Sequence, residues 1–151
     1  MNLFVKQSML LHSMLVRLVS VMLLSGISMA HGEIAVIINN SVSASNITLD
    51  VAANIFLGKV DELPGGIRMV PIDQEDGQKA RTEFYSKVVK KDAAQLNAYW
   101  SRLIFTGKGE PPKKVADNTD VLALVAANPN IIGYVDASAV NSTVKVLLRI
   151  P

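Results

Sequence analysis

Short apolar runs alternate along this chain with segments in which apolar residues recur at every third or fourth position. Residues 33–38 form a nearly continuous β-prone run without polar alternation, which is typical of a strand covered on both faces, as in parallel sheets. Residues 67–72, 131–135 and 144–148 predict three more strands. Strands interleaved with helices indicate an α/β fold with a mostly parallel or mixed sheet flanked by helices.

Two helices are predicted in the first half of this pattern. The first begins at Thr48, whose hydroxyl can cap it, and ends at Gly58. The second spans residues 78–90. Its apolar residues recur every fourth position and are expected to face the core: Ala80, Phe84 and Val88.

Two further helices follow. The third opens with a capping box between Asp92 and Gln95 and ends at Gly107, and the fourth spans residues 117–127. The apolar face of the third is expected to pack in the core, and it consists of Leu96, Trp100 and Leu103.

The first 30 residues predict a cleavable signal peptide. They contain Lys6 and Arg17 and no acidic residue. The apolar stretch after Arg17 is shorter than the roughly 20 residues that span a bilayer, and small residues stand at Ser28 and Ala30, where a cleavage site takes them. The alternative is an amphipathic or buried helix. We therefore expect a single domain at residues 31–151 of a periplasmic or secreted protein, without membrane insertion after cleavage.

Charge and residue types limit the classes of function. The full chain has 15 basic and 13 acidic residues, and removal of Lys6 and Arg17 leaves 13 of each. The net charge of the mature domain therefore predicts no nucleic-acid or anionic-membrane partner. The chain has no cysteine, which excludes disulfides, thiolate zinc sites and cysteine nucleophiles.

An enzyme is not predicted. The only histidine after the leader is His31, at the new N-terminus, where a flexible end rarely builds a catalytic site. The carboxylates Asp73, Glu75 and Asp76 can bind a hard cation, but no further ligand spacing accompanies them. We expect no catalytic residue, no metal and no cofactor.

Two loops are candidates for a binding site, because ligands of α/β folds gather where strands end. Side-chain and backbone donors are expected to converge there on a small anion or polar metabolite. The candidate ligand-binding residues are Asn40, Ser41, Ser43, Gln74, Gly77, Gln78 and Arg81. Turn chemistry alone explains the first three, and a solvated helix entry explains the next three. An arginine in the first turn of a helix, such as Arg81, more often pairs with neighbouring carboxylates such as Asp76.

Several segments resemble the phosphate-type periplasmic solute-binding proteins of ABC transporters. They are Ile-Phe-Leu-Gly-Lys at residues 55–59, Arg-Thr-Glu-Phe-Tyr at 81–85 and Asn-Pro-Asn-Ile-Ile-Gly-Tyr-Val at 128–135. Residues 94–109 resemble a stretch found in short, single-lobe relatives. The order and spacing of these segments fit from about residue 33 to 148, so the resemblance implies one lobe, the second, of a two-lobed protein.

The resemblance also implies a ligand loop, which is altered in this chain. In the phosphate binders this stretch resembles Ser-Arg-Glu-x-Gly-Ser-Gly-Thr-Arg, and the arginine, the hydroxyls and backbone N–H groups grip the oxyanion. Here Gln74 stands for the arginine and Gln78 for the serine, whereas Gly77 and Arg81 match.

Two hypotheses of function follow. The chain is an exported solute-binding-like module for phosphate or another small anion or polar ligand, in a transport or sensing system. Alternatively, it is a ligand-free structural or interaction protein of the cell envelope, with an envelope partner or a second copy of itself.

Overall fold

The computed structural model describes residues 32–151. The segment His31–Pro151 is a compact unit, and it contains both helices and strands as the sequence predicts. The predicted signal peptide lies outside the described residues and stays a prediction.

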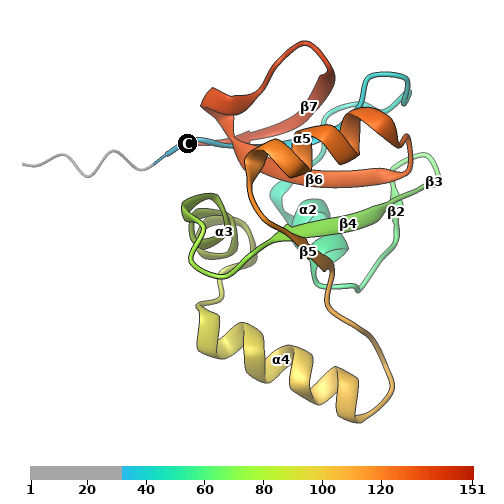
Figure 1. The fold of residues 1–151 in the computed structure, drawn as a ribbon. Helices are drawn as coiled ribbons and strands as arrows, with labels where there is room; N and C mark the ends of the chain where they lie inside the picture. Colours follow the sequence, from blue (N-terminus) through green and yellow to red (C-terminus); the bar gives the residue numbers. More distant parts are fainter. Residues whose placement is uncertain (1–31) are drawn as a thin grey trace, which may run out of the picture. The chain divides into compact units, whose positions relative to one another are not determined.

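A five-stranded mixed sheet forms the centre of the fold, in the order β5-β4-β6-β1-β7 (Figure 1). Strand β4 runs parallel to both β5 and β6, whereas β1 runs antiparallel to both β6 and β7. The strands are β1 (Ile34–Asn39), β4 (Val70–Gln74), β5 (Lys113–Val115), β6 (Ile131–Asp136) and β7 (Val144–Ile150). The short strands β2 (Glu62–Leu63) and β3 (Ile67–Arg68) form a separate hairpin.

The predicted caps position the helices. Thr48 Oγ1 accepts from the Val51 N–H at 3.3 Å to begin α2 (Leu49–Phe56). The Asp92–Gln95 capping box is present at the start of α4 (Ala93–Phe105). The remaining helices are α3 (Lys79–Phe84), its π-helical continuation η2 (Tyr85–Val89), α5 (Asn118–Ala127) and the 3-10 turn η3 (Ala137–Ala139).

Two apolar cores lie on the two faces of the sheet. The larger one joins alternate residues of β1, including Val36 and Ile38, to apolar residues of α2, α3, η2 and α4. The smaller one joins Ala35 and Ile37 to Val121 and Val125 of α5. Strand β1 is therefore covered on both faces, as its continuous apolar run predicts.

Three details differ from the sequence-based expectation. The predicted strand 67–72 is divided between β3 and β4, because buried Met69 leaves the ladder and its N–H donates to the Asp61 carbonyl at 2.8 Å. The predicted helix 78–90 widens into the π turn η2, in which Val88 and Val89 are both buried. Strand β1 has antiparallel neighbours on both sides, so its burial on two faces does not indicate a parallel environment.

No helix in the described part of the chain is long and apolar enough to cross a membrane.

Candidate functional site

The two predicted ligand loops lie at opposite ends of the sheet, so the expected convergence is wrong. Strand β1 pairs Ile34 with Asp136 and Ile38 with Ile132, whereas β4 runs in the same direction as β6. The end of β1 is therefore remote from the end of β4 at Gln74. Apolar patterning predicts that a strand is buried but carries no information on its direction, so it could not place these two loops relative to each other.

Asn40, Ser41 and Ser43 accordingly belong to a loop away from the Gln74 end. The Asn39 side chain, which sequence reasoning did not single out, holds this loop. Its amide donates to the Ala126 carbonyl at 2.7 Å, and its Oδ1 accepts from the backbone N–H of Ser41 at 2.9 Å. The Asn40 amide donates to the Ser142 carbonyl at 2.7 Å. Only the bond to Ser41 is a turn contact, whereas the other two tie the loop to the end of α5 and to the loop before β7. All three residues therefore lie outside any site at the end of β4.

Asp73 is a buried carboxylate at the centre of the end of the sheet where Gln74 lies. Its Oδ2 accepts from Arg81 Nε at 3.2 Å and from the Tyr85 hydroxyl at 3.0 Å. Its Oδ1 accepts from the Tyr134 hydroxyl and from the Gln74 N–H. Asp73 is thus the last but one residue of β4, and it is buried.

Arg81 is held by carboxylates on two sides. Its Nε faces Asp73, and its Nη1 lies 3.0 Å from Asp76 Oδ1. Asp76 in turn lies 2.9 Å from the Lys114 ammonium, and this hydrogen bond lowers the pKa of Asp76 despite some desolvation. Burial lowers the pKa of the Arg81 guanidinium, but Asp73 and its other neighbours raise it above its usual value. The predicted pairing of Arg81 with Asp76 is therefore confirmed, with Asp73 as a second partner.

Gln74 is buried rather than solvated at a helix entry. Its Nε2 donates to Asn118 Oδ1 and to the Tyr134 carbonyl, both at 3.0 Å. Its Oε1 has no hydrogen-bond partner among the described residues although it is buried. A buried acceptor without a donor is rare and marks a place where a donor group would add stability.

The amide of Asn118 extends this network to Asp136 at the end of β6. Asn118 Nδ2 donates to Asp136 Oδ2 at 2.7 Å, and the Asp136 N–H donates to Asn118 Oδ1 at 3.2 Å. Gln74, Asn118 and Asp136 therefore connect the C-terminal ends of β4 and β6 with the first turn of α5. Gln78 begins α3 at the same end without a side-chain capping bond, and Gly77 precedes it with φ of 90°.

A pocket of about 510 Å³ opens beside this network. Asp136 is one of its walls. Its other lining residues are Gly32, Glu33, Lys79, Ala137, Ser138 and Arg149. The charged side chains are two basic and two acidic, so the pocket offers no net charge to a ligand.

Several solved structures have a fold similar to that of this chain. A phosphate ABC transporter substrate-binding protein from Clostridium perfringens, solved with bound phosphate, superposes with a TM-score of 0.60 at 22% identity over 78% of this chain and 45% of the other. An ABC-type phosphate transport receptor from Vibrio cholerae superposes with a TM-score of 0.60 at 16% identity, over 78% of this chain and 46% of the receptor. PstS from Borrelia burgdorferi superposes with a TM-score of 0.55 at 14% identity, over 77% of this chain and 47% of PstS.

This chain has the fold of one lobe of a phosphate-type substrate-binding protein. The resemblance drawn from the sequence is thereby confirmed at the level of the fold. The chain spans less than half the length of each of these three proteins. Neither the scan against protein-family models nor the search of curated proteins found a match.

Within this lobe, sequence reasoning missed the residues that connect the ends of β4 and β6. Tyr134 and Tyr85 lie inside the segments that carry the family resemblance, but nothing in the spacing connects them to Asp73. Asp136 follows a buried strand, and the rule that selected Gln74 would also have selected it. Asn118 gives no signal, because its role depends on where α5 begins relative to β4.

The buried tyrosines predict a loss of stability at high pH. Burial raises the pKa of both Tyr85 and Tyr134, with Asp73 adding to the effect. The native state therefore keeps these protons while the unfolded state releases them above about pH 10, so the free energy of unfolding falls as pH rises beyond that value. The Tyr99→Phe variant keeps only Tyr85 and Tyr134 of the three tyrosines, so its tyrosinate absorbance reports on these two residues alone. In this variant, tyrosinate absorbance should appear together with the loss of circular dichroism. Tyrosinate absorbance that develops while the protein is still folded would contradict this.

Proposed function

We propose that this protein is an exported solute-binding-like module that binds a small polar or zwitterionic solute at the C-terminal ends of β4 and β6. The observation that carries the proposal is the buried Gln74, which stands where the related loop has an arginine and whose Oε1 has no donor among residues 32–151. Its amide connects through Asn118 to Asp136, which lines the pocket. The fold supports a binding role, since the similar C. perfringens structure holds phosphate.

The charges favour a polar ligand over a phosphate dianion. Arg81 is already paired with Asp73 and Asp76, and Lys114 is paired with Asp76. The two cations and two carboxylates of this group therefore have no net positive charge for a ligand. The adjoining pocket is likewise balanced. A dianion at either place would bring uncompensated negative charge close to carboxylates, which disfavours binding. A ligand with both donors and acceptors meets the Asp136 carboxylate and the basic side chains of the pocket equally well.

Isothermal titration of the unit His31–Pro151 with inorganic phosphate, sulfate, glycine and glutamine tests the proposal. We expect no heat from phosphate or sulfate and measurable binding heat from a zwitterion. Asp136→Asn should lower the affinity for this zwitterion at least about tenfold, the effect of losing a hydrogen bond to a charged group. Asp76→Asn is the matched control, because this carboxylate lies outside the pocket, and it should leave the affinity unchanged.

Two results would contradict the proposal. Phosphate binding that disappears in Arg81→Gln would place the ligand at the loop after β4 and restore the phosphate-binding role. The absence of heat for every ligand would favour the alternative function, an interaction protein of the envelope. The specific observation that supports this alternative is the pairing of Arg81 with Asp73 and Asp76, because the guanidinium that would bind an anion already binds carboxylates of the same loop.

A further inference from the structure

The end of helix α4 exposes two large apolar side chains to solvent. Phe105 is 92% exposed and Ile104 is 56% exposed, and both belong to the last turn of the helix. The buried side of the same helix packs through Leu96 and Trp100, so the outward position of Phe105 is fixed by the fold. Burial of two adjacent apolar side chains against another surface would remove their apolar area from water, which is favourable.

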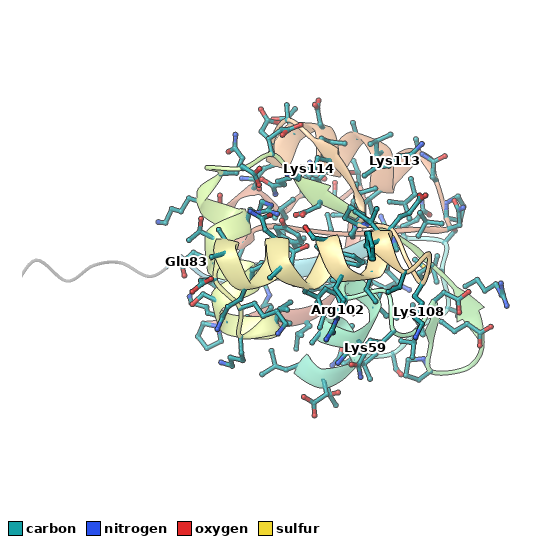
Figure 2. The ribbon with its side chains drawn as sticks, turned by 90° about the horizontal axis from the view of Figure 1, so that it is seen from below. Lys59, Glu83, Arg102, Lys108, Lys113 and Lys114 are labelled. Carbon is teal, nitrogen blue, oxygen red and sulfur yellow. The ribbon has the colours of Figure 1, made fainter. Side chains whose placement is uncertain are left out.

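Cationic side chains surround this apolar end. Arg102 lies in the last turn of α4 and Lys108 follows three residues after Phe105. Lys59 and Lys113 line an adjoining groove, and Figure 2 shows all four on the face that carries α4. We call these four residues the basic face.

The basic face carries charge that the fold does not use. None of its four cations forms an ion pair with a carboxylate among residues 32–151. Lys114, which Figure 2 shows on the same side, differs because it pairs with Asp76. The groove also contains two acidic residues, Asp61 and Glu110, of which Asp61 pairs with Arg68. The balanced net charge of the domain thus conceals an uneven distribution, and the net charge alone gave no reason to expect an anionic partner.

We propose that this face docks on an anionic lipid surface. Ile104 and Phe105 enter the boundary between headgroups and acyl chains, while the basic face contacts lipid phosphates. Insertion of a few apolar side chains combined with several cations is the arrangement by which peripheral proteins bind bilayers without spanning them. The proposal does not depend on the solute site, which is built on the ends of β4 and β6.

A bilayer fits this surface better than a protein does. A stable protein interface takes about 800 Å² from each partner, arranged as a complementary surface. Two adjacent side chains at a helix end supply much less, whereas a fluid bilayer accommodates a small projecting end without a matching shape. The cations nearest Phe105 lie within three residues of it along the chain, so they can reach the headgroups when the ring is inserted.

Co-sedimentation of the unit His31–Pro151 with vesicles tests the proposal, because this unit contains both cores and excludes the apolar leader. We expect binding to mixed phosphatidylglycerol–phosphatidylcholine vesicles, weakened by salt, and little binding to pure phosphatidylcholine. Phe105→Ser should weaken binding about tenfold, since it removes the main inserted side chain. Lys108→Gln should weaken it about fivefold, the contribution of one cation near an anionic surface.

Matched controls lie elsewhere on the molecule. Lys90→Asn removes a cation that ends η2, three residues before α4 begins, and α4 itself is about 18 Å long. Lys90 is left-handed, a conformation in which asparagine is tolerated. Leu49→Ser removes an exposed apolar side chain of α2. Both should bind vesicles as the unchanged protein does.

Three results would overturn the proposal. One is the absence of binding to anionic vesicles at low salt, and another is binding that Phe105→Ser and Lys90→Asn change equally. The third is self-association in solution that Phe105→Ser abolishes, which would show that the groove of a second copy receives the exposed end of α4.

Discussion

Replacing Asp73 by alanine should lower the free energy of unfolding by about 3–5 kcal/mol, the range observed when one partner of a buried ion pair is removed. The reason is the set of donors that surround this carboxylate. Arg81 Nε and the hydroxyls of Tyr85 and Tyr134 all donate to it, and Asp73 itself is 3% exposed. Alanine leaves these donors without an acceptor in an apolar environment. Urea unfolding followed by circular dichroism measures the effect.

The neighbouring carboxylate provides the control. Asp76 also pairs with Arg81, but its side chain is 71% exposed, so Asp76→Ala should change stability by no more than about 1 kcal/mol. Asp73→Asn should fall between the two variants, because the amide keeps the shape but loses the charge. Equal effects of Asp73→Ala and Asp76→Ala would show that burial of Asp73 does not determine its contribution.

The sequence was sufficient for features that depend on residues close together in the chain. Thr48 and the Asp92–Gln95 box begin helices as predicted, because a cap needs only a side chain and an N–H three positions later. The buried face of Ala80, Phe84 and Val88 was predicted for the same reason, since helical periodicity is local.

Features that depend on strand pairing were not predictable. A run of apolar residues such as β1 is equally compatible with parallel and antiparallel neighbours, and only the observed pairing places Asn40 at the end of the sheet opposite Gln74. The burial of Asp73 has the same origin. No residue close to Asp73 in the sequence indicates this burial, because β6 brings the Tyr134 hydroxyl to it from 61 residues away.

The site was therefore predicted in part. Arg81 was correctly expected to pair with a carboxylate, because Asp76 lies only five residues before it, in the turn that leads into the same helix. The network of Gln74, Asn118 and Asp136 joins three elements, and the sequence named only the first of its members. The exposure of Phe105 also escaped prediction, because it reflects where α4 stops packing on the core.

Close packing of α5 on the sheet depends on a glycine in the middle of β6. Gly133 is buried, and a Cβ atom built on it would lie 2.6 Å from Val121 Cγ1 of α5 and 3.3 Å from Ile72 Cγ1 of β4. Real Cβ atoms essentially never come as close as the first of these distances, so with a side chain here either Val121 or the helix that carries it must shift. Glycine at this position thus allows α5 to approach the strand.

Gly133→Ala should therefore destabilise the protein by about 2–3 kcal/mol, the cost of overpacking a close-packed core. The effect should shrink to under about 1 kcal/mol when the same change is made in a Val121→Ala background, because the colliding methyl group is then absent. Gly109→Ala is the matched control: its nearest neighbour would be Leu103 at 3.6 Å, an ordinary contact, and stability should stay within about 0.5 kcal/mol. Denaturant unfolding of the four variants and the unchanged protein gives the coupling directly. An equal cost of Gly133→Ala in both backgrounds would show that contact with Val121 is not the reason for glycine, and that the conformation of β6 itself requires it.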